Sequence, residues 1–314
     1  MTDDNATPYD RLRGQLAVLL LRLLATLPFA LNRRFGALLG WSAWRLGSES
    51  RRISDINIGI CFPDLDDAQR GTLVRRSMIE TGKGASELAY LWLHPEQAIG
   101  MIRHIDGDQP LRNTLAGGRP VIVLVPHLGC WEMVNFWLSS EFNLHAMFKP
   151  SKFEAVNELV GKSRSHFKST LHPATARGVA GVARALKSGP VVTGILPDQV
   201  PDRRSGVAVP FFGRPAWTGT LACKLLQQSG ARAFMMFAKR LPDTDGYALI
   251  IREPDAAIYE ADLDSSLAAM NRSIEALIRE APEQYIWNYK RFRQKTRELP
   301  ANPYRAPVPS GKQT

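Results

Sequence analysis

Hydrophobic residues are densest near the N-terminus of this 314-residue chain, where residues 14–31 read GQLAVLLLRLLATLPFAL. The stretch is apolar apart from Gln15, Arg22 and Thr26, and a charge near its centre is costly for a helix that crosses a bilayer. No small-residue cleavage site follows it, as one would in a signal peptide. Because arginines flank the stretch, we expect residues 1–48 to form a membrane-associated helical segment with its arginines on the cytoplasmic side. A helix buried in a soluble core is the alternative.

Beyond residue 48 the pattern alternates between helical and strand periodicity. Apolar positions at helical spacing over residues 66–92 predict one or two amphipathic helices. Short runs rich in β-branched residues and bounded by Gly or Pro predict buried strands. These strands cover residues 121–125, 191–196 and 233–238, and residues 247–251 complete a hairpin after an Asp-Thr-Asp-Gly turn. Helical patterns over residues 179–187 and 218–228 lie between the strands.

Strands that alternate with helices predict an α/β domain with a mixed, mainly parallel sheet flanked by helices. We place this domain at residues 49–299, followed by a flexible tail, rich in Pro and polar residues, at 300–314. The chain is long enough to bury a sizeable core as one domain.

Composition narrows the class of partner without selecting one. The formal net charge of +10 and the isoelectric point near 9.7 favour an anionic partner, which could be nucleic acid, a phosphate-bearing membrane or an acidic protein. The three cysteines are far apart and odd in number, so they form neither a disulfide framework nor a metal-binding motif. A reducing cytosol is the expected compartment.

A histidine follows the first predicted strand. Residues 120–132 read PVIVLVPHLGCWE, which places His127 after a buried strand and ahead of a predicted helix. Ligands of open α/β sheets bind at such strand ends. Residues five apart on a helix differ by about 140° in direction, so we expect His127 in the turn and Glu132 in the helix, pointing back at the imidazole. Gly129 permits such a turn.

This pair has the chemistry of acyl transfer to an alcohol. A neutral imidazole can remove the hydroxyl proton, while a carboxylate on its other ring nitrogen fixes the tautomer and stabilises the imidazolium. No Gly-x-Ser-x-Gly elbow marks a serine nucleophile, so direct transfer is the simpler prediction. Cys130 is an alternative nucleophile, but nothing marks it as an activated thiolate, and packing is its expected role. A histidine that only caps the strand is the structural alternative.

Several further motifs resemble the late acyltransferases of lipid A biosynthesis, which add secondary acyl chains to Kdo-lipid IVA in Gram-negative bacteria. The matching stretches keep their order and cover nearly the whole chain, most clearly from Arg51 onward. They read RRISDINIGICFPDL at 51–65, HLGCWE at 127–132, FKP at 148–150, ARALKSGPVVTGILPDQVP at 183–201, VPFFG at 209–213, TGT at 218–220 and PEQYIWNYKRFR at 282–293.

The resemblance implies a fold like that of glycerolipid acyltransferases and a location on the cytoplasmic face of the inner membrane. It implies acyl-acyl carrier protein as the acyl donor, an anionic glycolipid as the acceptor, and no metal or organic cofactor. The family's His-x-x-x-x-acid motif, which carries the catalysis, falls on His127 and Glu132.

Three further residues are candidates for binding substrate or stabilising charge. The resemblance assigns such helper roles to Arg177, which precedes a helix, and to Asp198, which ends a strand. An arginine at position 177 could form bidentate hydrogen bonds to a phosphate or to a developing oxyanion. Lys149, between a predicted strand and Pro150, is a candidate phosphate contact. Relatives carry Asp-His-Asp or a similar acidic set where this chain has Asp198-Gln199-Val200, so the chain departs from the pattern after Asp198.

Three alternative functions remain open at this point. The chain could acylate another glycolipid or aminolipid, or it could be a lipid or thioester hydrolase that uses the same His and Glu on water. It could also be a basic membrane-surface or nucleic-acid-binding protein, since residues 285–295 mix aromatic and basic side chains. We expect no nucleic-acid partner, because lipid phosphates or an acidic carrier protein account for the same charges.

Overall fold

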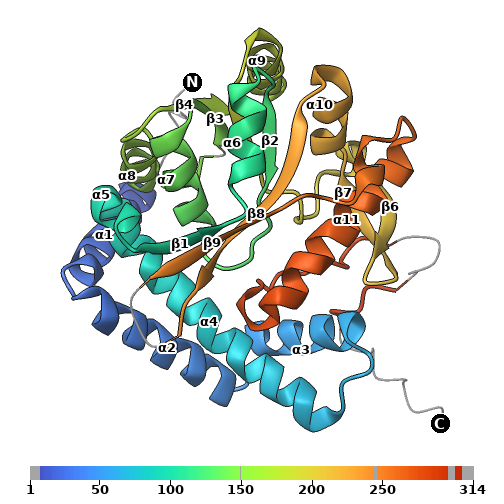
Figure 1. The fold of residues 1–314 in the computed structure, drawn as a ribbon. Coiled ribbons are helices and arrows are strands. Elements are labelled where there is room, and N and C mark those ends of the chain that lie inside the picture. The colour runs from blue at the N-terminus through green and yellow to red at the C-terminus, as the bar shows by residue number, and fades with distance from the viewer. Residues whose placement is uncertain (1–7, 149, 243–245, 296–300, 306–314) are drawn as a thin grey trace.

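A seven-stranded sheet with the order β1-β9-β8-β2-β5-β3-β4 forms the centre of the computed structural model, which describes residues 8–148, 150–242, 246–295 and 301–305. Every neighbouring pair of strands is parallel except β8 and β9, which are antiparallel (Figure 1). The strands are β1 (Ile102–Asp106), β2 (Val121–Leu124), β3 (Leu144–Phe148), β4 (Ser169–Pro173), β5 (Val192–Ile195), β8 (Arg232–Arg240) and β9 (Tyr247–Arg252). A separate antiparallel hairpin consists of β6 (Gly206–Phe211) and β7 (Arg214–Gly219).

Helices cover both faces of this sheet. They are α1 (Pro8–Ala25), α2 (Phe29–Arg45), α3 (Glu49–Cys61), α4 (Asp67–Leu93), α5 (Pro95–Ile99), α6 (Gln109–Ala116), α7 (Trp131–Glu141), α8 (Glu154–Arg164), α9 (Ala176–Ser188), α10 (Leu221–Ser229) and α11 (Leu263–Glu280). Three short 3-10 turns are η1 (Arg203–Ser205), η2 (Ala256–Tyr259) and η3 (Pro282–Gln284). The alternation of side chains along β2 divides the core, because Ile122 and Leu124 join the cluster under α9, α10 and α11. Val121 and Val123 face the opposite cluster, which contains residues of α6 and α7.

The structure confirms an α/β fold with a mainly parallel sheet. The four predicted strands correspond to β2, β5, β8 and β9, and β8 and β9 pair antiparallel as predicted. Residues 66–92 form the single helix α4, which begins with a capping box between Asp66 and Gln69. One predicted helix begins later than expected. Thr218 and Gly219 belong to β7, where the hydroxyl of Thr218 is buried and accepts a hydrogen bond from Arg291, so α10 begins only at Leu221.

The apolar N-terminal stretch forms two helices rather than one. Pro28 precedes α2 and separates it from α1, consistent with the preference of proline for helix starts. Glycines bring α2 against α4, since a Cβ on Gly40 would collide with the carbonyl of Met78 and one on Gly82 with the carbonyl of Gly36. Among the described helices, none has the length and apolar character needed to cross a bilayer.

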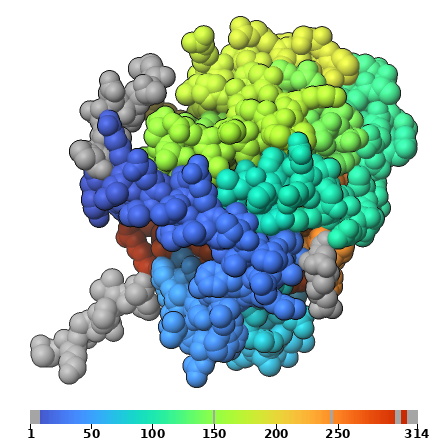
Figure 2. Space-filling model, turned by 90° about the vertical axis from the view of Figure 1, so that its left-hand side faces the viewer, coloured from blue at the N-terminus to red at the C-terminus, as the bar shows by residue number. Residues whose placement is uncertain are grey.

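Figure 2 shows that the N-terminal helices lie across one face of the molecule. Twelve of the fourteen large hydrophobic side chains that the described residues expose belong to this part of the chain. They are Tyr9, Leu12, Leu16, Leu19, Leu20, Leu23, Leu31, Phe35, Leu38, Leu39, Trp41 and Leu46; the other two are Leu196 and Tyr259. Such a concentration of exposed apolar side chains on two adjacent helices marks an interaction surface.

Part of the predicted C-terminal tail is packed against the domain. Residues 301–305 are described, and Tyr304 is buried, with its hydroxyl bonded to Asn57 at 2.5 Å and accepting from the backbone N–H of Phe292 at 3.0 Å. The carbonyl of Tyr304 also accepts from Nη2 of Arg52 at 2.9 Å, so three hydrogen bonds join this residue to the body of the protein. The rest of that tail, residues 306–314, lies outside the described residues.

Candidate active site

His127 and Asp198 meet at the carboxyl edge of the sheet. His127 follows β2 and Asp198 follows β5, and these two strands are parallel neighbours. Residues that leave adjacent parallel strands in the same direction lie side by side, where α/β proteins place their ligands. The sequence predicted both residues at strand ends, and the structure brings them together although they are about seventy residues apart in the chain.

A hydrogen-bonded pair results from this juxtaposition. Nδ1 of His127 lies 2.8 Å from Oδ1 of Asp198, and the backbone N–H of His127 donates to Oδ2 at 2.9 Å. Burial by itself raises the pKa of Asp198, but the interactions with His127 outweigh it and leave that pKa below its ordinary value. Asp198 is therefore a carboxylate at neutral pH. A carboxylate at Nδ1 keeps the proton on that nitrogen and leaves Nε2 free as a base.

The other side of the imidazole faces the surface. The amide nitrogen of Gln199, an exposed side chain, lies 3.0 Å from Nε2 of His127, which suits a donor amide and an acceptor Nε2. The Trp131 ring contacts the imidazole at a tilt of 57°, with centroids 5.1 Å apart. The His127 side chain is 12% exposed, whereas the Asp198 side chain is 1% exposed. Displacement of Gln199 would therefore present the lone pair of Nε2 to an incoming group.

The expected pairing of His127 with Glu132 is wrong in its geometry. Glu132 lies in the first turn of α7 as predicted, but its buried carboxylate forms an ion pair with the partly exposed Arg164 of α8. Nε of Arg164 lies 3.1 Å from Oε2 of Glu132, and the second oxygen accepts from the same guanidinium. The physical reason is that α8 brings Arg164 to the start of α7, and a bidentate guanidinium occupies both carboxylate oxygens. Asp198, not Glu132, orients the imidazole.

The turn between His127 and α7 depends on Gly129. Its φ is +60°, and a Cβ at this position would collide with the carbonyl oxygen of Ala238 in β8. That same carbonyl accepts a hydrogen bond from the backbone N–H of Cys130 at 2.9 Å. The turn therefore lies directly against the backbone of β8, and the prediction that Gly129 permits this turn is confirmed.

Residues 284–286, near the C-terminus, form backbone hydrogen bonds with the same turn. The backbone N–H of Ile286 donates to the carbonyl of His127 at 3.1 Å, and that of Gly129 donates to the carbonyl of Gln284 at 3.0 Å. Tyr285 is buried beside Asp198, and burial together with that carboxylate raises the pKa of its phenol well above the usual value. Residues 284–286 of the PEQYIWNYKRFR motif therefore support the turn.

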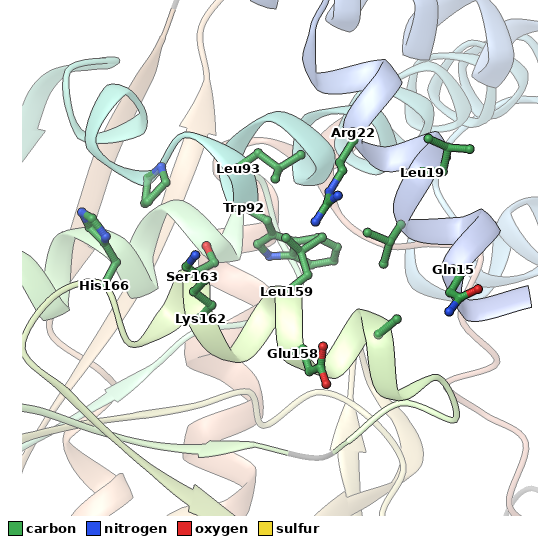
Figure 3. Close-up of a pocket in the computed structure, with 13 residues that line it drawn as sticks. Gln15, Leu19, Arg22, Trp92, Leu93, Glu158, Leu159, Lys162, Ser163 and His166 are labelled. Atoms are coloured by element: carbon green, nitrogen blue, oxygen red, sulfur yellow. The ribbon is translucent and has the colours of Figure 1, made fainter. Parts of the chain in front are cut away.

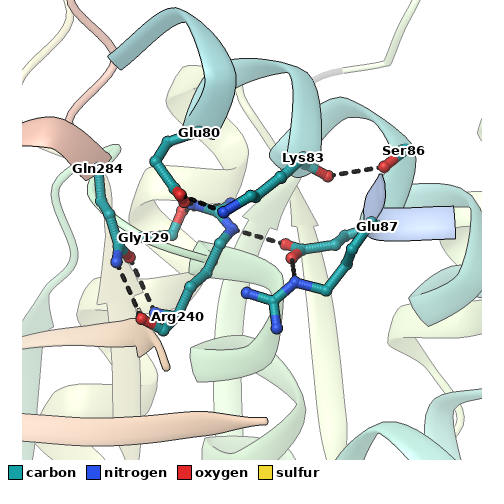
Figure 4. Close-up of polar contacts among 8 residues, drawn as sticks. Glu80, Lys83, Ser86, Glu87, Gly129, Arg240 and Gln284 are labelled. Atoms are coloured by element: carbon teal, nitrogen blue, oxygen red, sulfur yellow. Dashed lines mark hydrogen bonds and ion pairs between the residues drawn. The ribbon is translucent and has the colours of Figure 1, made fainter. Parts of the chain in front are cut away.

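A buried charge cluster also reaches the turn. Nη2 of Arg240 donates to the carbonyl of Gly129 at 3.1 Å, and Nε of Arg240 pairs with Glu87 of α4 at 2.8 Å (Figure 4). Glu87 in turn pairs with Arg33 of α2 at 2.9 Å. The backbone of Arg240 exchanges two hydrogen bonds with the side chain of Gln284, at 2.8 and 2.9 Å. The turn is thus connected through side chains to an N-terminal helix.

Within the part of the chain that it describes, the structure does not bring the other predicted site residues into contact with His127 and Asp198. Arg177 is exposed in the first turn of α9, after β4, which is three strands from β2 and so roughly 14 Å away by strand spacing. Among the described residues Arg177 has no ion-pair partner. Lys149 lies outside the described residues. Burial raises the pKa of Cys130 to about 12, so this side chain is a packed thiol and not a nucleophilic thiolate.

Sequence reasoning missed Arg164, Gln199 and Tyr285 as parts of this site. Arg164 carries no motif, and only the structure shows that α8 brings it to Glu132. Gln199 and Tyr285 stand in the motifs DQVP and PEQY, so those motifs were the available signal. Within the described ranges no group of three His, Cys, Asp or Glu side chains is arranged to hold a metal ion.

The start of α7 contributes backbone donors beside the imidazole. The first N–H groups of a helix lack i−4 carbonyl partners, and α7 begins at Trp131, whose ring contacts His127. The N–H of Met133 donates to the carbonyl of Cys130 at 3.1 Å, which leaves those of Trp131 and Glu132 as the candidate donors. Such a helix start favours negative charge. Together with an imidazole held by a buried carboxylate, this arrangement can activate a hydroxyl and stabilise an oxyanion.

Comparisons with known proteins show the family of the chain. The family model described as bacterial lipid A biosynthesis acyltransferase matches residues 9–294. The lipid A biosynthesis lauroyltransferase of Escherichia coli K12 is 29% identical over 289 residues, which cover 91% of this chain and 93% of that protein. The palmitoleoyltransferase of the same organism is 26% identical over 270 residues, covering 85% and 86%, and its myristoyltransferase is 26% identical over 255 residues, covering 81% and 78%. The chain therefore belongs to the bacterial lipid A biosynthesis acyltransferase family and is an acyltransferase.

Proposed function

We propose that this acyltransferase moves a fatty acyl chain from acyl-acyl carrier protein to a hydroxyl of a lipid A precursor of the Kdo-lipid IVA type. The single observation that carries the proposal is the His127–Asp198 pair, with Nε2 of the imidazole turned toward the surface. The names of the relatives, which are lipid A lauroyl-, palmitoleoyl- and myristoyltransferases, support the choice of acceptor.

In the proposed mechanism His127 is the general base. Nε2 takes the proton of the acceptor hydroxyl as its oxygen attacks the thioester carbonyl, and Asp198 stabilises the imidazolium that forms. The N–H groups at the start of α7 stabilise the negative charge on the former carbonyl oxygen. The tetrahedral intermediate then expels the carrier thiolate, which receives the proton from His127. A carbon–oxygen bond forms, a carbon–sulfur bond breaks, and no metal or organic cofactor takes part.

In this proposal Glu132 does not orient the imidazole, the role that the His-x-x-x-x-acid motif suggests. Its carboxylate lies in the first turn of α7, where negative charge is favoured by the helix dipole, and it is neutralised by Arg164. The ion pair fixes the start of α7 against α8. Glu132 thereby positions the backbone donors of α7, while Asp198 acts on the imidazole itself.

The proposed donor fits the charge beside the site. Arg203 and Arg204 are exposed in η1, four and five residues after Gln199, and the side chain of Arg293 reaches the carbonyl of Val200 at 3.4 Å. No described carboxylate forms an ion pair with Arg203 or Arg204. The positive charge of these arginines beside the His127 site is complementary to that of an acidic carrier protein.

The proposed location is the cytoplasmic face of the inner membrane. The exposed leucines of α1 and α2 support it, because an apolar face flanked by arginines suits the boundary between headgroups and acyl chains. An acceptor lipid held in the same membrane would then reach the site from the bilayer.

A product assay tests the proposed function. His127→Ala should lower acyl transfer by about three orders of magnitude or more, and Asp198→Asn by about two, while both variants keep the circular dichroism of the wild type. Purified enzyme, acyl-acyl carrier protein and lipid acceptor would be combined and the products identified by mass spectrometry. Free fatty acid as the sole wild-type product would favour a thioester hydrolase instead. Near-normal transfer by His127→Ala would exclude the mechanism.

A further inference from the structure

A cavity of about 670 Å³ lies between α1, the end of α4 and α8. Its lining contains none of the residues of the His127 site. The thirteen side chains that line it are Gln15, Val18, Leu19, Arg22, Trp92, Leu93, Pro95, Ala155, Glu158, Leu159, Lys162, Ser163 and His166. The His127 site therefore does not account for the presence of this cavity.

The lining of this cavity is amphiphilic. Val18, Leu19, Leu93 and Leu159 give it apolar walls, and Figure 3 shows Arg22 extending from α1 toward the ring of Trp92. Arg22 and Lys162 are exposed, and no described carboxylate forms an ion pair with either. Apolar walls beside two unpaired cations fit a ligand that has a hydrocarbon chain and a negative charge.

Two buried polar atoms of the lining lack a hydrogen-bond partner. They are Nε1 of Trp92 and Oγ of Ser163, and the Ser163 residue is only 3% exposed. The indole N–H can only donate, and a buried polar group without a partner is costly. A ligand rich in acceptor oxygens, such as a phosphate ester, would supply what this donor lacks.

The position of the cavity points to a membrane as the source of the ligand. Leu19 lines the cavity, and Leu16, Leu20 and Leu23 of the same helix are exposed on the apolar N-terminal face. A lipid in the surrounding bilayer would reach the cavity without leaving the membrane. Lys162 and Ser163 directly precede Arg164, which forms the ion pair with Glu132. A lipid bound in the cavity would therefore contact α8, the helix that carries Arg164.

We propose that this cavity is a binding site for an anionic phospholipid of the bilayer, separate from the acceptor lipid. The phosphate lies between Arg22 and Lys162, and the first part of an acyl chain lies along Val18 and Leu159. Lipid binding at this site is measured without catalysis. A protein that does not bind the phospholipid would overturn this inference and leave the proposed acyl transfer unaffected.

Native mass spectrometry of the purified full chain in detergent tests the site, with phosphatidylglycerol as the probe. The variant Arg22→Gln/Lys162→Gln should raise the apparent Kd by about thirtyfold, since each cation near a lipid headgroup is worth about fivefold in affinity. Arg11→Gln/Lys168→Gln removes the same charge from nearby exposed positions outside the cavity and should change the Kd by less than about twofold. Leu159→Trp, which fills the cavity, should also weaken binding.

Four outcomes would overturn the proposal. They are unchanged binding by the Arg22/Lys162 variant, an equal loss in the control variant, and equally tight binding of zwitterionic phosphatidylcholine. The fourth is stoichiometric displacement of phosphatidylglycerol by a lipid A precursor, which would make the cavity a part of the acceptor site. If the double variant does not fold, Leu159→Trp takes its place, and unchanged phosphatidylglycerol binding by that variant would overturn the proposal equally.

Discussion

The carboxylate that serves His127 comes from the neighbouring strand and not from the neighbouring helix. Sequence reasoning identified both His127 and Asp198 but paired the histidine with Glu132, five residues away. Proximity along the chain is a poor guide at the edge of a parallel sheet, where residues some seventy positions apart become adjacent. Glu132 could not have been assigned to Arg164 from sequence, because α8 carries no signal that it approaches α7.

Asp198 should make the stability of the protein depend on acid pH. Its folded pKa is lowered, so its contribution is fully present above the unfolded value of about 3.9 and is lost as the pH falls through the folded pKa. Asp198→Asn lacks this contribution. We expect the variant to be about 1.5–3 kcal/mol less stable than the wild type at pH 7, the contribution of a hydrogen bond to a charged group, with the difference closing only below about pH 4.

Urea denaturation of both proteins at a series of pH values measures this difference. A gap that closes between pH 7 and pH 5 would contradict the assignment, because it would require an Asp198 pKa raised by burial.

Glu132 should contribute to stability through Arg164. Glu132→Gln leaves the guanidinium without its charge partner, and we expect a loss of about 2–4 kcal/mol, at the low end for buried pairs because the Arg164 side chain is 22% exposed. The double variant Glu132→Gln/Arg164→Met should recover part of this loss. Together with the single variant Arg164→Met, denaturation midpoints of the three variants give the coupling energy, and strictly additive losses would show that the pair is not coupled.

At the scale of elements, the strands buried on both faces were predictable and the exposed ones were not. Runs such as VIVL in β2 are continuous and apolar, since helices cover both sides of the sheet. The edge strand β4 reads STLHP and β1 reads IRHID, and neither shows a continuous apolar run. The N-terminal stretch was predicted as helical, but its division at Pro28 into two helices was not.

The turn that carries His127 should not tolerate a side chain at position 129. Gly129→Ala combines a left-handed backbone with a collision against Ala238, and we expect a loss of more than about 2 kcal/mol together with loss of transfer. Gly118 has a similar φ of +80° but open space around it. Gly118→Ala is therefore the matched control and should cost about 1 kcal/mol with activity retained. Equal effects of the two substitutions, in thermal unfolding and in transfer assays, would argue against close packing of the turn.

At the scale of the whole molecule, the apolar face of α1 and α2 should determine membrane attachment. Leu16→Gln/Leu20→Gln/Leu23→Gln removes three exposed leucines from α1 without touching the sheet. Each buried leucine is worth about 1.5–3 kcal/mol, so even partial insertion predicts at least a tenfold loss of vesicle binding. Sedimentation with anionic vesicles in roughly 0.5 M salt, which screens the arginines, measures the apolar part of the attachment. Binding that disappears in salt for the wild type as well would show that charge alone holds the protein.

The charge cluster around Glu87 ties the integrity of the His127 turn to the N-terminal helix α2. Shortening the chain to begin after Arg45 would remove Arg33 and uncover the glycine-lined side of α4, leaving Glu87 and Arg240 in an opened interior. A version trimmed for solubility would consequently lose the scaffold on which Gly129 rests. We therefore expect that active protein is obtained only when the chain is purified with both N-terminal helices, in detergent or in lipid nanodiscs.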